Sequence, residues 1–84
     1  MLVQHMLGKR IKKARLTAGF GQAELARLIG IQPITLWKIE NSRVDPGLKT
    51  LERIATALRV TIDSLVHGTR SAPPSESPNG EVSG

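Results

Sequence analysis

One short segment carries most of the chemistry that this sequence of 84 residues offers. Residues 33–40 are expected to form a helix with Leu36 and Ile39 turned toward the core, because these positions lie on one helical face. The side chains left facing outward are Gln32, Pro33, Ile34, Thr35, Trp37 and Lys38. Their amide, hydroxyl and ammonium groups can bond to base edges, whereas the apolar groups can only contact a group such as a thymine methyl. Three of these six side chains, Gln32, Thr35 and Lys38, have groups that can donate a hydrogen bond to a base edge.

Catalysis finds little support in the sequence. His5 and His67 stand near opposite ends of the chain, without partners at the spacing of a metal site. No Ser/His/acid set, glycine-rich phosphate loop or pair of carboxylates stands out. The chain has no cysteine, so it forms no disulfide and offers no thiolate ligand. We therefore expect a protein that is not an enzyme and that needs no metal and no cofactor.

The distribution of charge points to a polyanionic partner. Twelve Lys and Arg against seven Asp and Glu give a net charge of +5. Five of the cations fall within seven residues: Lys9, Arg10, Lys12, Lys13 and Arg15. Clustered cations fit nucleic acid, and Lys9, Arg10 and Lys13 suit long-range attraction rather than readout. A solvated helix face would show the same pattern.

A membrane partner is the weaker interpretation of these cations. The segment lacks the large apolar face with Trp, Phe and Leu that an interfacial helix carries. No apolar run approaches the roughly 18 residues of a membrane span, and residues 1–6 are too few for a signal peptide. We expect a cytoplasmic protein with no membrane partner.

Three residues, Gly30, Ile31 and Gln32, separate the helix at 33–40 from an expected helix at 22–29. Gly30 can adopt the left-handed conformation in which helices often end. Pro33 suits the first position of a helix and keeps Gln32 out of the helical region, so the two helices cannot fuse. Residues 22–40 are therefore predicted to form a helix, a tight turn and a second helix.

Apolar spacing predicts three further helices. The first spans residues 7–18, and its buried face is expected at Leu7, Ile11, Ala14 and Ala18. Another is marked by the apolar positions Leu48, Leu51, Ile54, Ala55 and Leu58. A short last helix is expected at 62–66, behind a cap at Thr61. The folded domain is thus predicted to span residues 7–67.

Residues 68–84 have the composition of a tail. The sixteen residues after Gly68 hold four Ser, three Pro and two Gly, with one apolar residue larger than Ala. Such a segment cannot bury enough apolar surface to offset the entropy lost on ordering, so we expect it to be disordered.

Residues 22–40 resemble the helix-turn-helix of phage-repressor DNA-binding domains of the Cro type, also called the xenobiotic-response-element family. The residues that match, at the spacing of that family, are Gln22, Leu25, Ala26, Gly30, Ile31, Leu36, Ile39 and Glu40. The similarity extends from about residue 7 to residue 65, which is much more specific than a match over twenty residues. It implies an all-α fold, a compact five-helix bundle of the lambda-repressor-like DNA-binding type.

The resemblance implies roles for individual positions. The positions of Pro33, Ile34 and Lys38 contact bases in the family, and Thr35 stands near the DNA backbone. Gln22 stands where the family uses a glutamine against a phosphate; otherwise it is simply the first residue of its helix. Family members often carry polar residues at positions 33 and 34, so this departure favours a larger share for readout of DNA shape.

Four further residues need a separate interpretation. The resemblance implies that Arg15 and Glu40 form a largely buried ion pair, which belongs to the scaffold. Trp37 could stack at the edge of the DNA backbone or anchor a partner, or it could fold over the first helix or the 41–44 loop. Arg43 could reach a phosphate together with Lys38, or be merely solvated.

These observations predict a small transcriptional regulator, a repressor, that binds double-stranded DNA sequence-specifically. Helix 33–40 would enter the major groove. One such helix contacts few base pairs, so a homodimer on a palindromic site is expected. The dimer surface is predicted near the end of the domain, from the set Leu48, Leu58, Val60, Ile62, Leu65 and Val66, of which Leu58 and Leu65 are better explained as core.

Two other functions stay open. One is an antitoxin-like or adaptor module that binds a protein partner, in which case the basic face is incidental. The other is RNA binding, which two aromatic residues in the whole chain make a poor fit, because a stacking platform needs more.

Overall fold

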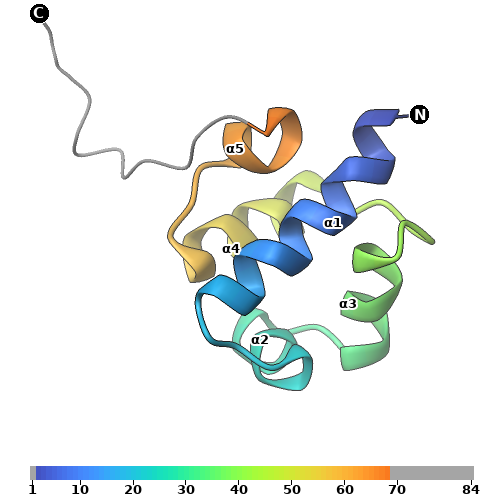
Figure 1. The fold of residues 1–84 in the computed structure, drawn as a ribbon. Coiled ribbons are helices and arrows are strands. Elements are labelled where there is room, and N and C mark those ends of the chain that lie inside the picture. Colours follow the sequence, from blue (N-terminus) through green and yellow to red (C-terminus); the bar gives the residue numbers. More distant parts are fainter. Residues whose placement is uncertain (1, 69–84) are drawn as a thin grey trace, which may run out of the picture.

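Five helices make up the part of the chain that the structure describes. The computed structural model in Figure 1 describes residues 2–68, with side chains from Met6 onward. The helices are α1 (Leu2–Thr17), α2 (Gln22–Ile29), α3 (Pro33–Glu40), α4 (Leu48–Leu58) and α5 (Ile62–His67). The predicted all-α bundle of five helices is confirmed over these residues. The prediction of a disordered tail falls on residues 69–84, which lie outside the described part.

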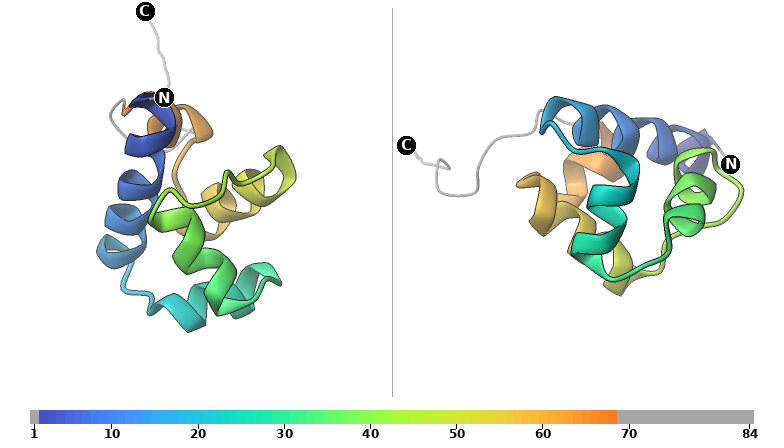
Figure 2. Two further views of the ribbon diagram at one scale, coloured as in Figure 1. Left: turned by 90° about the vertical axis from the view of Figure 1, so that its right-hand side faces the viewer. Right: turned by 90° about the horizontal axis from the view of Figure 1, so that it is seen from below.

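The helix α1 is the element around which the others pack. It contacts α3, α4 and α5, while α2 packs against α3 and α4. Figures 1 and 2 show α5 on one side of α1, and α2 and α3 on the other. Among the described helices, none is both long and apolar enough to cross a membrane.

The core receives one large, fully buried side chain from each of the first four helices. These are Ile11, Leu25, Leu36 and Ile54, and Leu65 of α5 is 2% exposed. Burying an aliphatic side chain of this size stabilises the fold by about 1.5–3 kcal/mol. Every helix therefore contributes to one shared core.

The turn between α2 and α3 has the predicted conformation. Gly30 ends α2 in the left-handed region, at φ 80°. Gln32 is extended, with φ −73° and ψ 145°, and Pro33 is the first residue of α3. The change from left-handed to extended backbone redirects the chain within three residues, so the two helices form a compact unit.

The boundaries of α1 differ from the prediction. The helix begins at Leu2 instead of residue 7 and ends at Thr17. Once a helix has nucleated, it extends by one hydrogen bond per residue without any apolar pattern, so the early start left no periodicity to detect. At the other end Ala18, predicted to be buried, is exposed because the chain has already left the helical face.

Two smaller differences concern α4 and α5. Leu48, predicted on the apolar face of its helix, is 67% exposed. It is the first residue of α4, and the core covers the apolar side of this helix only from Leu51 onward. The helix α5 extends one residue beyond the predicted end, to His67.

Gly8 allows α1 to cross very close to the end of α3. A methyl group added at Gly8 would lie 2.6 Å from the carbonyl oxygens of both Ile39 and Glu40. These are backbone atoms, which cannot rotate away as a side chain would. Glycine in a helix interior normally costs about 0.5–1 kcal/mol relative to alanine. The close crossing of the two helices explains a glycine at this position.

We predict that Gly8→Ala destabilises the protein by about 1–3 kcal/mol, because the added methyl overpacks the crossing. Chemical denaturation followed by circular dichroism measures the change. Gly47→Ala is the matched control, since no atom lies within 4 Å of its added methyl group. A gain in stability for Gly8→Ala, the usual result within an unobstructed helix, would contradict the close crossing.

Candidate nucleic-acid interface

The structure places the predicted contact residues of α3 at the surface. Ile34 is 57% exposed and Trp37 is 39% exposed. Gln32, Pro33 and Lys38 are also exposed, while Thr35 is half-buried. The opposite side of the helix is buried, through Leu36, Ile39 and Glu40. The division of α3 into an inner and an outer side therefore follows the prediction.

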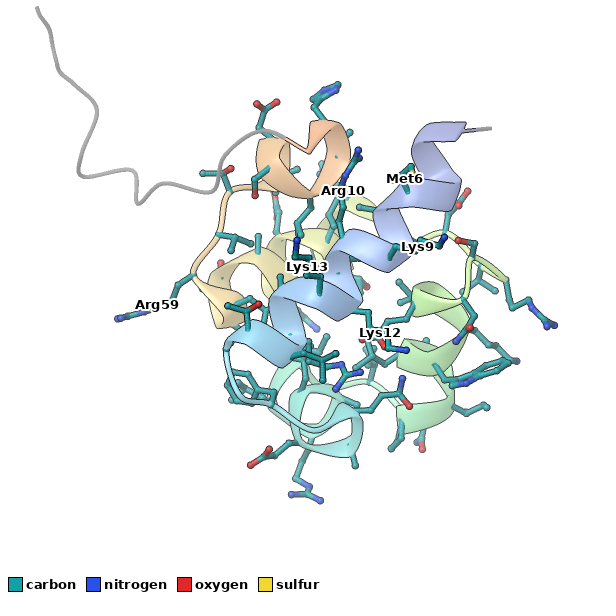
Figure 3. All side chains as sticks on the ribbon, in the orientation of Figure 1. Met6, Lys9, Arg10, Lys12, Lys13 and Arg59 are labelled. Carbon is teal, nitrogen blue, oxygen red and sulfur yellow. The ribbon has the colours of Figure 1, made fainter. Side chains whose placement is uncertain are left out.

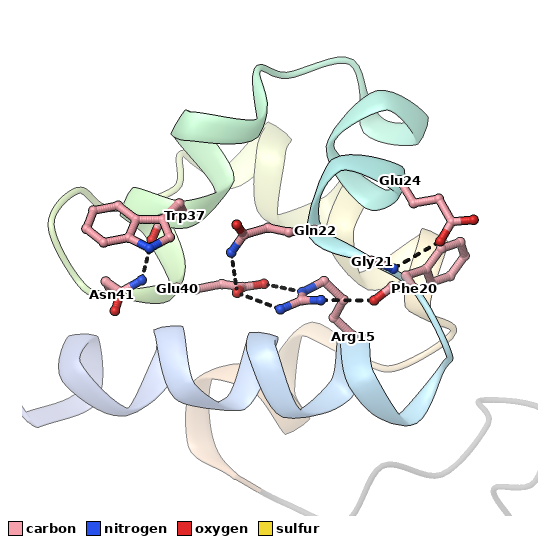
Figure 4. Close-up of polar contacts among 8 residues, drawn as sticks. All are labelled: Arg15, Phe20, Gly21, Gln22, Glu24, Trp37, Glu40 and Asn41. Carbon is pink, nitrogen blue, oxygen red and sulfur yellow. Dashed lines mark hydrogen bonds and ion pairs between the residues drawn. The ribbon is translucent and has the colours of Figure 1, made fainter.

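Glu40, the last residue of α3, forms a buried ion pair with Arg15 of α1. The guanidinium donates through Nε to Oε2 at 2.7 Å and through Nη2 to Oε1 at 3.1 Å. Its Nη1 also donates to the carbonyl oxygen of Phe20 at 2.9 Å. Arg15 is 6% exposed and Glu40 is 4% exposed. This two-pronged geometry, drawn in Figure 4, is the strongest form of such a pair.

Gln22, the first residue of α2, bonds to the same carboxylate. Its Nε2 donates to Oε1 of Glu40 at 2.9 Å (Figure 4). The contact ties the start of α2 to the end of α3. The side-chain amide carries two hydrogens, so one remains for an anion outside. A phosphate contact by Gln22 stays a prediction, whereas the internal bond is a structural role that the sequence did not indicate.

Trp37 and Arg43 lie together beside α3. The guanidinium carbon of Arg43 is 5.5 Å from the centre of the Trp37 ring, within the range of a cation–π contact. Asn41 donates through Nδ2 to the carbonyl oxygen of Trp37 at 2.9 Å. Of the alternatives considered for Trp37, the contact with the 41–44 loop is therefore present, and it leaves part of the ring exposed.

The turn after α3 places Arg43 in this position. Ser42 adopts a left-handed conformation, at φ 60°. Its N–H donates to the carbonyl oxygen of Ile39 at 3.1 Å, and the N–H of Arg43 donates to that of Lys38 at 2.8 Å. This pair of bonds is a Schellman motif, which reverses the chain at the end of a helix.

The basic cluster of α1 is divided between two sides of the helix. Lys9 and Lys12 point toward the side on which α3 lies, as Figure 3 shows. Arg10 points the other way and donates through Nη1 to the carbonyl oxygen of Val66, in α5, at 2.9 Å. Lys13 lies on the α5 side as well. The charge pattern of the sequence does not show that these cations lie on two different sides of α1.

The site is thus a helix-turn-helix whose second helix presents Lys38, Ile34 and Trp37, with lysines beside it and a buried ion pair behind it. Among the side chains that the structure describes, from Met6 to Gly68, no three of His, Asp or Glu gather in a way that would hold a metal ion. These features define a class of binding domain, and comparison with known proteins places the chain within it.

A family model described as "Helix-turn-helix" matches residues 11–65. The chain belongs to this family. It is 36% identical over 66 residues to the SPbeta prophage-derived uncharacterized HTH-type transcriptional regulator YonR of Bacillus subtilis (strain 168), covering 79% of this chain and 61% of that relative. Other curated relatives are also longer, and the chain spans 57% and 56% of two regulators named SinR.

Solved structures share the fold. The P22 c2 repressor in complex with a synthetic operator aligns with a TM-score of 0.71 and 27% identity, over 75% of this chain and 96% of that one. The restriction-modification controller protein C.AhdI from Aeromonas hydrophila aligns with a TM-score of 0.72 and 25% identity, over 77% and 98%. The predicted phage-repressor-like fold is confirmed.

We predict that Glu40→Ala lowers the melting temperature far more than Glu52→Ala. The first change leaves the buried Arg15 without its partner, at a cost of about 3–5 kcal/mol. Glu52 is exposed on α4, so its loss removes little. Thermal unfolding followed by circular dichroism compares the two variants. Equal shifts would mean that the ion pair does not hold the fold.

Proposed function

We propose that the protein binds double-stranded DNA sequence-specifically and acts as a transcriptional regulator, in particular a repressor. The observation that carries this proposal is the exposed outer side of α3, which the Arg15–Glu40 pair holds against α1. The names of relatives support it, since they include a repressor solved on a synthetic operator and proteins named as HTH-type transcriptional regulators. These relatives favour DNA binding over an antitoxin-like or adaptor module. The proposed role is that of a cytoplasmic binding protein and not of an enzyme.

In this proposal α3 enters the major groove and reads bases through Lys38 and Ile34. The ammonium group of Lys38 can donate to a guanine edge, and the exposed Ile34 can contact a thymine methyl. Pro33 offers an apolar surface, and Thr35 stands near the DNA backbone. Because so few of these groups form hydrogen bonds, part of the specificity comes from the shape and deformability of the site.

Phosphates are held around this helix by groups from three elements. Gln22 offers its second amide hydrogen at the start of α2, where the helix dipole favours an anion. Arg43 extends from the loop after α3, steadied by Trp37. Lys9 and Lys12 add charge from α1. Such contacts fix the register of the protein on the duplex but carry no sequence information.

We further propose a homodimer on a palindromic site, formed through α5. The predicted dimer surface loses Leu58 and Leu65, which are buried in the core, while Leu48 stays a candidate because it is 67% exposed. Ile62 and Val66 stand four apart on α5 and are only half-buried. They are the apolar groups of α5 that a second copy can cover.

Binding to a mixed-sequence duplex is expected to weaken steeply with salt. Each phosphate contact contributes about −0.9 to the slope of log affinity against log salt. Four contacting cations therefore predict a loss of about a hundredfold between 50 and 200 mM salt. Fluorescence anisotropy of a labelled duplex measures it. If the protein fails to bind the duplex even at low salt, the proposed function is wrong.

Lys38→Ala is expected to weaken binding to a selected operator by roughly tenfold and to relax the choice at one base position. Arg27→Ala is the matched control, because it removes an exposed cation from α2 beside Glu52 rather than from α3. Both affinities can be read from the same anisotropy titration. If the two variants lose affinity equally, then Lys38 acts only through its charge.

Ile62→Lys is expected to shift the protein from dimer to monomer, because it places a charge within the proposed contact. Sedimentation equilibrium over a range of concentrations measures the shift. Leu28→Lys changes a leucine that is 60% exposed on α2 and should leave the dimer intact. A wild-type protein that stays monomeric, or a dimer that survives Ile62→Lys, would contradict the proposed surface.

A further inference from the structure

A concave surface lies on the side of α1 away from α3. It is a groove of about 520 Å³ between α1, the end of α4 and α5. Its accessible apolar lining consists of Ala14, Ala18 and Val60, and its cationic lining consists of Arg10, Lys13 and Arg59. We call it the α1–α5 groove. The proposed DNA contacts use none of its residues.

The charge of the α1–α5 groove has one sign. Three of its lining residues are cations, and none is an Asp or a Glu. Arg10 is held in place by its hydrogen bond to Val66, and its side chain would meet any atom added at Gly68. Lys13 and Arg59 are exposed and free to turn toward a bound group. The groove therefore presents one fixed and two adjustable positive charges.

Arg59 occupies a backbone position where glycine is the usual residue. It ends α4 in the left-handed conformation, at φ 59°. Helices that end this way mostly use glycine, because other side chains are strained there. The strained backbone turns a guanidinium out at the end of the groove, where Figure 3 shows it standing away from the bundle.

We propose that the α1–α5 groove is a docking site for an acidic segment of a partner protein, one that carries apolar residues between its carboxylates. Carboxylates complement the three cations, and apolar side chains pack on the lining formed by Ala14, Ala18 and Val60. Charge complementarity of this kind mainly sets which partner binds and how fast. No residue that lines the groove belongs to α3.

Two other occupants fit the groove less well. A nucleic-acid backbone would satisfy the cations, but its phosphates would leave the apolar lining without a partner. A second copy of this chain would bring the same three cations to face their equivalents across a two-fold axis, because such a contact uses the same patch on both copies. Like charges opposed in this way disfavour association.

Titration of the isotope-labelled full chain with a synthetic peptide tests the proposal, with backbone amide shifts as the signal. The probe is a twelve-residue peptide of alternating Glu and Leu pairs. The control peptide has Lys in place of every Glu. The acidic peptide is expected to shift the amides of residues 10–18, 58–60 and 64–68, and the basic peptide is expected to shift none of them.

Charge reversal locates the contact. The double variant Lys13→Glu/Arg59→Glu is expected to bind the acidic peptide at least tenfold more weakly. The control is Lys49→Glu, the same change at an exposed residue of α4 outside the groove, and it is expected to bind the peptide as the unmodified chain does. Glycine adopts the positive φ of position 59 without strain, so Arg59→Gly removes one cation without lowering the stability of the fold. It should therefore weaken binding in a protein of undiminished stability.

Several results would overturn the proposal. The acidic peptide could leave the groove amides unmoved, or the double variant could bind it as well as the unmodified chain does. A mixed duplex that shifts the same amides would show a nucleic-acid site. Shifts of residues 10–18 and 58–59 that change on dilution without peptide would show contact between copies in the groove, because the proposed dimer contact on α5 does not include these residues. None of these outcomes depends on whether α3 binds an operator, so a failure here is distinct from a failure of the proposed function.

Discussion

The buried contact between Arg15 and Glu40 is the constraint on which the candidate DNA-binding surface depends. It joins the end of α1 to the end of α3, and Gln22 adds the start of α2 to the same carboxylate. Two opposite charges removed from water stabilise a fold only when their geometry and remaining hydrogen bonds are good. Here the guanidinium makes three hydrogen bonds and the carboxylate accepts three. The orientation of α3 is therefore set by directional bonds as well as by the apolar core.

The same helix that anchors α3 also separates two surfaces of the molecule. On one side of α1, lysines stand near the exposed residues of α3; on the other, Arg10 and Lys13 line the α1–α5 groove. At Gly8, α1 lies so close to the end of α3 that a methyl group has no room between α1 and the carbonyl groups of α3. The spacing of cations along α1 thus serves two faces, since neighbouring residues of a helix point in different directions.

The sequence predicted the elements better than their contacts. The limits of α2 and α3 could be predicted because Gly30 and Pro33 act within a few residues of themselves. The bond from Gln22 to Glu40 joins residues eighteen positions apart, and the close approach at Gly8 depends on where α1 crosses α3; neither leaves a local signal. Leu48 was misplaced because a periodic pattern does not show where the covered part of a helix begins. The outer side of α3 was predicted correctly, but the side chains exposed there do not determine which DNA sequence is bound.

Protection of Trp37 from a quencher tests most directly whether the outer side of α3 is the DNA-binding surface. Trp37 is the only tryptophan of the chain and is 39% exposed, so its emission reports on this face alone. Acrylamide quenching would be measured with and without a saturating duplex, whose binding is followed separately by anisotropy. The proposed interface predicts that the quenching constant falls severalfold when the duplex is bound. A bound duplex that leaves the quenching of Trp37 unchanged would contradict it.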